Sequence, residues 1–309
     1  MLYEECPAPP ALQPFVAAFW LVRGEPAARY EKILPGPSSH LVLNLSEPYR
    51  VIEPFRRGPG PDGPGRPAAT EMTAGFHAGL QRSFLISENP ERIFNIGAVL
   101  APFGLPAFTA EPPAALQGRV VDADLIFPGF SGLRAELRDP TPAQAFAALG
   151  AFLTDRLRGA YRSDERAVSA VAALTTEDVR VGVLAGRLGV SESTLERIMA
   201  RECGVGPKAY ADVCRFHRFV TAASTLPKGA AAGRELLALA DYYDQPHLIR
   251  AFRRFAGYTP SEYLRVVYEY GPEFATFVPL TGVPGGSAGE RPGSAAGAGF
   301  IQDRREAGR

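Results

Sequence analysis

The sequence is poor in the residues from which disulfide frameworks and metal centres are built. It has 3 cysteines and 4 histidines in 309 residues, and Cys6, Cys203 and Cys214 lie far apart. Such cysteines are too few and too scattered for a disulfide framework or a zinc knuckle. No apolar run approaches the roughly 18 residues of a membrane span, and no basic-then-apolar signal segment opens the chain. We therefore expect a cytoplasmic protein with no membrane partner.

An excess of charge of either sign is also missing. The chain carries 33 basic and 33 acidic residues. Residues 165–270 hold 14 basic and 12 acidic residues, a net charge of +2. Neutralising a polyanion would therefore contribute only modestly to binding by this part of the chain. Its positive field should be local to four arginines, Arg250, Arg253, Arg254 and Arg265.

What the sequence does contain is an internal repeat with a constant offset of 53 residues. Leu195 recurs as Leu248, and Gly204 recurs as Gly257. Each copy has the pattern of a short helix, a tight turn, a longer helix closed by glycine, and a helix that begins with proline. The same offset relates further pairs: Leu184 and Leu237, Ala185 and Ala238, Arg197 and Arg250, Pro207 and Pro260, Tyr210 and Tyr263.

In the first copy, apolar spacing predicts an amphipathic helix over Val181–Leu188 with Val181, Val183, Leu184 and Leu188 on its buried stripe. Gly189 ends this helix. Ser191 is placed to cap a second helix, whose core face is formed by Leu195, Ile198 and Met199. Gly204 suits a left-handed position after that helix, and Pro207 begins the next one.

In the second copy, Leu236–Ala240 is the supporting helix and Asp244 takes the capping position. Gln245, Pro246 and His247 form the first turn of the second helix, where proline is tolerated. After Gly257, the segment Thr259–Glu262 has the pattern of a capping box.

These motifs resemble both halves of the AraC-type (AraC/XylS) DNA-binding domain of transcription regulators. The match covers about a third of the chain. Asp241 stands where the family usually has a glycine and Met199 where it usually has a phenylalanine, but both residues suit those positions. The resemblance rests on Leu184–Ala185, Gly189–Ser191, Thr194–Leu195, Arg197, Gly204, Pro207 and Tyr210, and on Tyr242–Gln245, His247–Leu248, Arg250–Arg254, Gly257–Pro260 and Tyr263.

The resemblance implies two recognition helices that read successive major grooves of double-stranded DNA. Arginine pairs bidentately with guanine and glutamine with adenine, so Arg197, Arg250 and Gln245 are candidates for base reading. Glu196 can accept from cytosine, although it repels phosphate. The full set of predicted DNA-contacting residues is Ser193, Glu196 and Arg197 in the first helix, and Gln245, Pro246, His247, Arg250, Arg253 and Arg254 in the second.

Two plainer interpretations stand beside this one. In an arbitrary helix an exposed arginine is more often solvated or paired than base-reading, and a histidine such as His247 is more often an ordinary surface residue. The near neutrality of residues 165–270 is also compatible with a protein-interaction module that has degenerate helix-turn-helix units.

The N-terminal 160 residues have a different character. Short apolar runs separated by proline, glycine and serine predict a β-rich domain. Thr141–Pro142 begins a helix, which we expect to bridge to the DNA-binding part. Residues 56–67 are a proline-glycine hairpin insertion, predicted to be disordered. The apolar runs are Phe15–Val22, Leu41–Leu45, Phe84–Ile86 and Ile96–Leu100.

This region resembles the uncharacterised β-rich sensor-like domain found before some AraC-type domains. The resemblance rests on Pro14–Val16, Phe19–Trp20, Leu34–Leu45 and Val120–Leu125. It implies a cupin-like effector or dimerisation module and specifies no ligand. A metal-binding cupin needs several histidine and carboxylate ligands, whereas this region has only His40 and His77. We expect no metal, no cofactor and no enzyme activity; a cupin-like enzyme is the least favoured alternative.

The sequence thus predicts an α+β protein. It should have two domains, since 309 residues exceed the roughly 250 to 300 that one core commonly supports. Residues 1–162 should form a β-rich, cupin-like effector or dimerisation domain with a bridging helix. Residues 163–270 should form an all-α AraC-type domain with two helix-turn-helix units, and residues 271–309 a flexible tail. The expected function is transcription regulation, with a small-molecule effector or a homodimer as further partners. Operator, sign of regulation and effector stay open.

Overall fold

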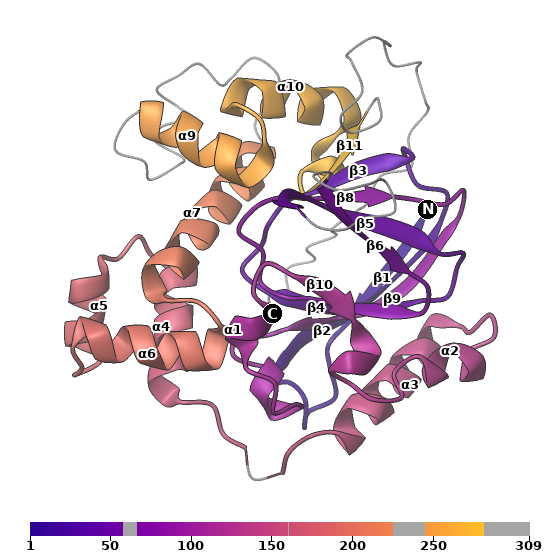
Figure 1. The fold of residues 1–309 in the computed structure, drawn as a ribbon, viewed down its shortest axis with the longest axis horizontal. Helices are drawn as coiled ribbons and strands as arrows, with labels where there is room; N and C mark the ends of the chain where they lie inside the picture. Colours follow the sequence, from indigo (N-terminus) through magenta and orange to yellow (C-terminus); the bar gives the residue numbers. More distant parts are fainter. Residues whose placement is uncertain (58–66, 160, 225–244, 281–309) are drawn as a thin grey trace, which may run out of the picture.

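A computed structural model describes residues 1–57, 67–159, 161–224 and 245–280 (Figure 1). It confirms the predicted α+β class, with a β-rich N-terminal domain followed by a helical region. The predicted disordered insertion lies almost wholly outside the described residues. The second supporting helix and Asp244, the predicted cap of the second recognition helix, also lie outside them. No helix in the described ranges is long and apolar enough to cross a membrane.

Two antiparallel sheets form the β-rich domain (Figure 1). Sheet A has the order β1 (Leu2–Cys6), β2 (Val16–Gly24), β9 (Ile93–Leu100), β4 (Ser39–Asn44), β7 (Gly75–Ala78) and β10 (Val120–Asp122). Sheet B has the order β11 (Phe277–Leu280), β3 (Tyr30–Ile33), β8 (Leu85–Glu88), β5 (Tyr49–Arg57) and β6 (Pro67–Met72).

The inner faces of the two sheets bury a small apolar core. Val42 and Phe76 of sheet A pack against Val51, Met72 and Leu85 of sheet B. Alternation along each strand sends the neighbouring side chains to the outer faces. The sheets therefore form a sandwich in which both outer faces also need cover.

Short helices cover the outer face of sheet A. They are η1 (Leu105–Ala107), α1 (Pro113–Leu116), η2 (Ala123–Leu125), α2 (Gly132–Glu136) and α3 (Pro142–Asp155). Thr141 and Gln144 close the capping box that begins α3. The Phe146 ring stacks on Phe19 of β2 at 6.5 Å between centroids, so α3 packs on sheet A.

The helical region covers the outer face of sheet B. Leu34, Phe84 and Ile86 share one hydrophobic core with the helices. The helices are α4 (Glu165–Thr176), α5 (Val181–Arg187), α6 (Glu192–Cys203), α7 (Pro207–Ser224), α9 (Gln245–Ala256) and α10 (Pro260–Tyr270).

Residues 272–280 depart from the predicted flexible tail. They form η3 (Pro272–Phe274) and β11. Strand β11 pairs with β3, and Val278 lies opposite Lys32 in this pair. Val278 is fully buried in the core that sheet B shares with the helices. Strand pairing with β3 supplies the backbone of this proline-containing segment with hydrogen-bond partners that its local sequence does not indicate. Residues 281–309 of the predicted tail lie outside the described ranges.

His77 on β7 links stability to pH. Its side chain is 0% exposed, lies beside Phe127, and neither ring nitrogen has a hydrogen-bond partner in the described structure. Burial, with a smaller contribution from His40, lowers the pKa of His77 to about 3. The unfolded chain binds this proton near pH 6.5, so the contribution of His77 to stability is present above pH 6.5 and is lost as the pH falls toward 3.

We predict that His77→Leu flattens the acid side of the stability curve. Between pH 6 and 4, the wild type should lose up to about 1.4 kcal/mol per pH unit more than the variant, which is the linkage of one proton. Urea unfolding at half-unit pH steps measures this difference. His247→Leu, which removes an exposed histidine, is the control. Parallel curves for the wild type and His77→Leu would contradict the assignment.

Candidate nucleic-acid interface

The first helix-turn-helix unit consists of α5 and α6. Leu184 is buried as predicted, and Ala185 is buried beside it. Val183 is 52% exposed, so the buried stripe of α5 differs from the one that its apolar spacing indicates. Gly189 adopts a left-handed φ of 67° between the two helices. This turn sets the angle at which α6 leaves its support.

Helix α6 begins at the predicted cap. The Ser191 hydroxyl accepts a hydrogen bond from the Thr194 amide at 3.2 Å. Leu195, Ile198 and Met199 are buried, so they hold one face of α6 against the core. The opposite face exposes the three predicted DNA-contacting residues, Ser193, Glu196 and Arg197.

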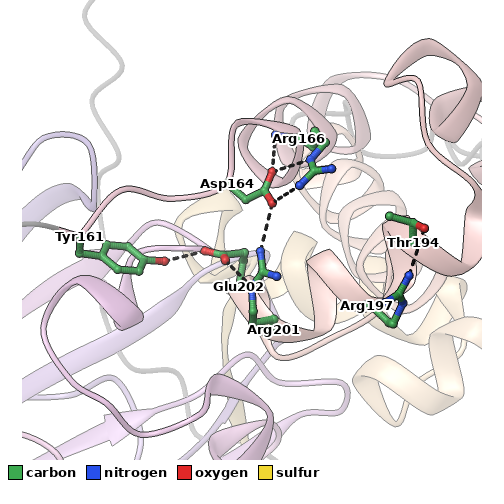
Figure 2. A network of polar contacts seen from close by, with 7 residues as sticks. All are labelled: Tyr161, Asp164, Arg166, Thr194, Arg197, Arg201 and Glu202. Atoms are coloured by element: carbon green, nitrogen blue, oxygen red, sulfur yellow. Dashed lines mark hydrogen bonds and ion pairs between the residues drawn. The ribbon is translucent and has the colours of Figure 1, made fainter.

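Two of these side chains lie along the protein surface. Arg197 donates from Nη2 to the Thr194 hydroxyl at 3.2 Å (Figure 2) and from Nε to the Ser193 carbonyl at 3.4 Å. The Glu196 carboxylate lies against Gly206, where an added Cβ would come within 1.9 Å of Oε1. Both side chains are exposed, so rotation about their own bonds would carry them outward.

The predicted second recognition helix corresponds to α9. Leu248, Phe252 and Phe255 are buried along one face. The six predicted DNA-contacting residues are all exposed: Gln245, Pro246, His247, Arg250, Arg253 and Arg254.

Helix α7 joins the two units through an aromatic cluster. The Phe216 ring lies 5.1 Å from that of Phe252 and 4.8 Å from that of Phe255, measured between centroids. Phe219 meets Phe252 at 4.8 Å. Such ring pairs contribute about 0.5–1.5 kcal/mol beyond the area they bury, so α7 is the main support of α9.

An ion-pair chain crosses the same junction. Arg254 of α9 donates to Asp212 of α7 at 3.2 Å, and Arg215 bridges Asp212 at 3.3 Å to Asp178 at 2.6 Å. The Arg254 guanidinium also lies 4.3 Å from the centre of the Phe255 ring. Sequence patterns do not reveal the pairing of Arg254 with Asp212. Because of this ion pair, a phosphate would compete with Asp212 for Arg254.

Comparison with known families matches two segments of the chain. Residues 184–265 match a helix-turn-helix domain family, and residues 4–122 match a domain of unknown function called DUF6597. The chain carries an AraC-type helix-turn-helix domain behind a DUF6597 domain. This confirms the resemblance drawn from the repeat, and the AraC-type domain supports a DNA-binding transcription regulator.

Solved structures that match this chain include ToxT of Vibrio cholerae and CuxR. An apo ToxT variant has a TM-score of 0.44 and 10% identity over 80% of this chain and 97% of its own. Wild-type ToxT with a bound unsaturated fatty acid has a TM-score of 0.42 and 12% identity over 80% and 94%. The AraC-like activator CuxR has a TM-score of 0.27 and 18% identity over 72% and 86%. None of the curated protein sequences matches this chain.

Each recognition helix of the AraC-type domain ends on the DUF6597 side of the molecule. Gly204 after α6 has φ 75°, and a Cβ there would lie 2.7 Å from the Pro113 backbone of α1. Gly257 after α9 has φ 67°, and a Cβ there would lie 2.6 Å from the Phe84 ring. Repeat-equivalent glycines thus permit both a left-handed turn and a close approach to the β-rich domain.

A polar network joins the interdomain segment to the C-terminal end of α6 (Figure 2). Tyr161 donates to Glu202 at 2.6 Å, and Arg201 contacts Glu202 at 2.9 Å and Asp164 at 3.0 Å. A hydrogen bond from Arg166 is the main reason that the pKa of Asp164 falls to about 2. Burial, reinforced by Glu202, raises the pKa of Tyr161, so the phenol remains a donor.

In the described ranges, the histidines and carboxylates do not assemble a metal site. Among the described residues, no group of three or more His, Cys, Asp or Glu side chains is arranged to hold an ion. Phe15 and Phe19 are core residues beneath the short helices.

We predict that alanine at Gly204 costs more than alanine at Gly189. Both glycines are left-handed, so each substitution should cost about 1–2 kcal/mol of backbone strain. A Cβ at Gly189 meets nothing within 4 Å, whereas one at Gly204 strikes the Pro113 backbone. The clash should add about 1–3 kcal/mol. Urea unfolding of both variants tests this difference, and equal losses would mean that α6 does not rest on α1.

Proposed function

We propose that this protein is a sequence-specific transcription regulator that inserts α6 and α9 into two successive major grooves of DNA. The main support is that the nine predicted contact residues are all exposed and lie on helices related by the 53-residue repeat. Figure 1 shows α6 and α9 on the same side of the β-sandwich, joined through α7. A major groove admits one helix, and successive grooves recur about every 34 Å.

Base reading should fall to residues near the start of each helix, because later residues diverge toward the backbone. Arg197 and Arg250 have the donor fork that matches guanine, and Gln245 matches adenine. Ser193, Pro246 and His247 would line the groove beside them. Glu196 would accept from cytosine.

Arg253 and Arg254 lie farther along α9, where phosphate contact is expected. Both are exposed, but Arg254 already pairs with Asp212 and stacks on Phe255. We assign backbone contact first to Arg253. If Arg254 bound a phosphate, it would give up its ion pair with Asp212. Arg254 would therefore contribute less to the binding free energy than Arg253.

The DUF6597 domain would be the regulatory part, acting through a small-molecule effector or through dimerisation. Its sheet B shares a hydrophobic core with the helices of the AraC-type domain. A ligand or partner that changes this domain would therefore act on the helices through a continuous apolar contact. Thermal-shift screening of metabolites and concentration-dependent sedimentation of the full chain distinguish the two.

We predict that Gln245→Ala relaxes specificity at one base pair. Selecting DNA from random duplexes with the full-length protein supplies the operator. On that operator the variant should lose about 1–3 kcal/mol of binding free energy, and on scrambled DNA little. Binding to all single-base substitutions of the operator, measured at two salt concentrations, gives the specificity profile.

The matched control is Gln13→Ala, which removes an exposed glutamine from the β-rich domain. It should leave the profile unchanged. If Gln245→Ala also leaves the profile unchanged, α9 does not read bases in the proposed way. Equal affinity of the wild type for selected and scrambled duplexes would overturn sequence reading altogether and favour an interaction module.

A further inference from the structure

The AraC-type domain touches the β-rich domain at the same point of each repeat. The contact point is the glycine turn that follows each recognition helix, Gly204 after α6 and Gly257 after α9. The contacted elements differ, because α1 meets the first turn and the β3–β8 side of sheet B meets the second. The β-rich domain therefore contacts the C-terminal ends of both helices.

We propose that the β-rich domain fixes the separation and relative angle of α6 and α9 by gripping the C-terminal end of each, and so selects the spacing between the two half-sites on DNA. This inference rests on the proposed function, since it concerns how the two recognition helices are presented. It assigns a positioning role to Tyr161 and Lys32, neither of which is among the predicted DNA-contacting residues.

The first grip combines steric contact with buried polar contacts. The Pro113 backbone lies where a side chain at position 204 would be. Glu202 in the last turn of α6 is only 6% exposed and accepts the Tyr161 hydroxyl. The Tyr161 ring lies 6.0 Å from Phe15 of the β-rich domain, so one side chain connects that domain to α6.

The second grip is centred on a buried lysine. Lys32 of β3 donates from Nζ to the carbonyl of Ala256, the last residue of α9, at 3.1 Å. The same ammonium lies 3.5 Å from the centre of the Tyr258 ring and 4.4 Å from that of Phe84. A cation at a helix C-terminus offsets the partial negative charge of the unpaired carbonyls, and aromatic faces add cation–π attraction.

Strand β11 strengthens the second grip. It follows α10 and η3 and pairs with β3, next to Lys32. The Leu34 amide donates to the Thr276 carbonyl at 2.9 Å, and the Tyr263 hydroxyl of α10 donates to the Ala275 carbonyl at 3.0 Å. The segment from α9 to β11 is thus attached to sheet B at its beginning, through Ala256 and Lys32, and at its end, through β11 and β3.

These two grips fix the separation and relative angle of α6 and α9, which α7 alone leaves adjustable. A single helix between two units resists changes in their distance but permits bending and twisting along its length. Two further contacts to a close-packed sandwich remove that freedom, because packed interiors deform little. An effector that moved α1 relative to β3 would therefore change how far apart the reading surfaces lie.

Distances between spin labels test the grips without DNA. Labels at Glu192→Cys and Arg253→Cys, in a Cys6→Ser background, report the separation of α6 and α9 in the full chain. Lys32→Met and Tyr161→Phe remove one polar grip each. Their controls are Arg29→Met, which removes a cation beside β3 that pairs with Glu88, and Tyr3→Phe, which removes a tyrosine–glutamate hydrogen bond on β1.

We expect a narrow distance distribution for the wild type and both controls, and a broadened one for Lys32→Met, Tyr161→Phe and above all the double variant. Thermal unfolding of each protein as a single transition verifies that it is folded. Distributions as narrow in the double variant as in the controls would overturn the proposal and leave α7 as sufficient support.

Operators of altered spacing test the consequence for DNA. Inserting or deleting one base pair between the half-sites moves them by about 3.4 Å and turns them by about 35°. The unlabelled wild type and controls should lose affinity on the order of tenfold, and the double variant less than about threefold. Preference within each half-site should not change in any of them.

Equal spacing penalties in the double variant and the wild type would contradict the proposal. A wild type without base preference on any operator would instead defeat the proposed function. The label distances separate these two failures, because they are measured on the free protein.

Discussion

The structure depends on one hydrophobic core that is centred on helix α7. Tyr210, Phe216 and Phe219 of this helix are fully buried, and the same cluster reaches the supports of α6, the apolar face of α9 and the outer face of sheet B. Neither helix-turn-helix unit buries its apolar face alone, because each consists of short helices. The core around α7 therefore supports both recognition helices and at the same time attaches the β-rich domain to them.

Local sequence was informative wherever the backbone itself imposes the residue. Ser191 caps α6, Gly204 and Gly257 take left-handed conformations, and Thr259 and Glu262 close a capping box. Each of these requirements lies within a few residues along the chain, so the repeat and the turn chemistry predict it. The apolar runs of the N-terminal region likewise predict strands, because alternating burial is a property of one strand and its two faces.

What sequence could not supply was the identity of distant partners. Val183 fits a buried stripe by spacing, yet it is 52% exposed. Pairing of Arg254 with Asp212 joins residues 42 positions apart. For the candidate site the sequence indicated which side chains are exposed, whereas their present hydrogen bonds and the grips at the glycine turns depend on tertiary contacts.

Strand β11 also has a consequence for biosynthesis. It forms the edge of sheet B beside β3, but it is made about 240 residues later in the chain. Until the ribosome has released that segment, β3 presents an open row of backbone donors and acceptors, which is the kind of edge that pairs with other chains. Sheet B is thus completed only after the DNA-binding region has been synthesised. A chain truncated before β11 would expose the unpaired edge of β3 and be prone to aggregation.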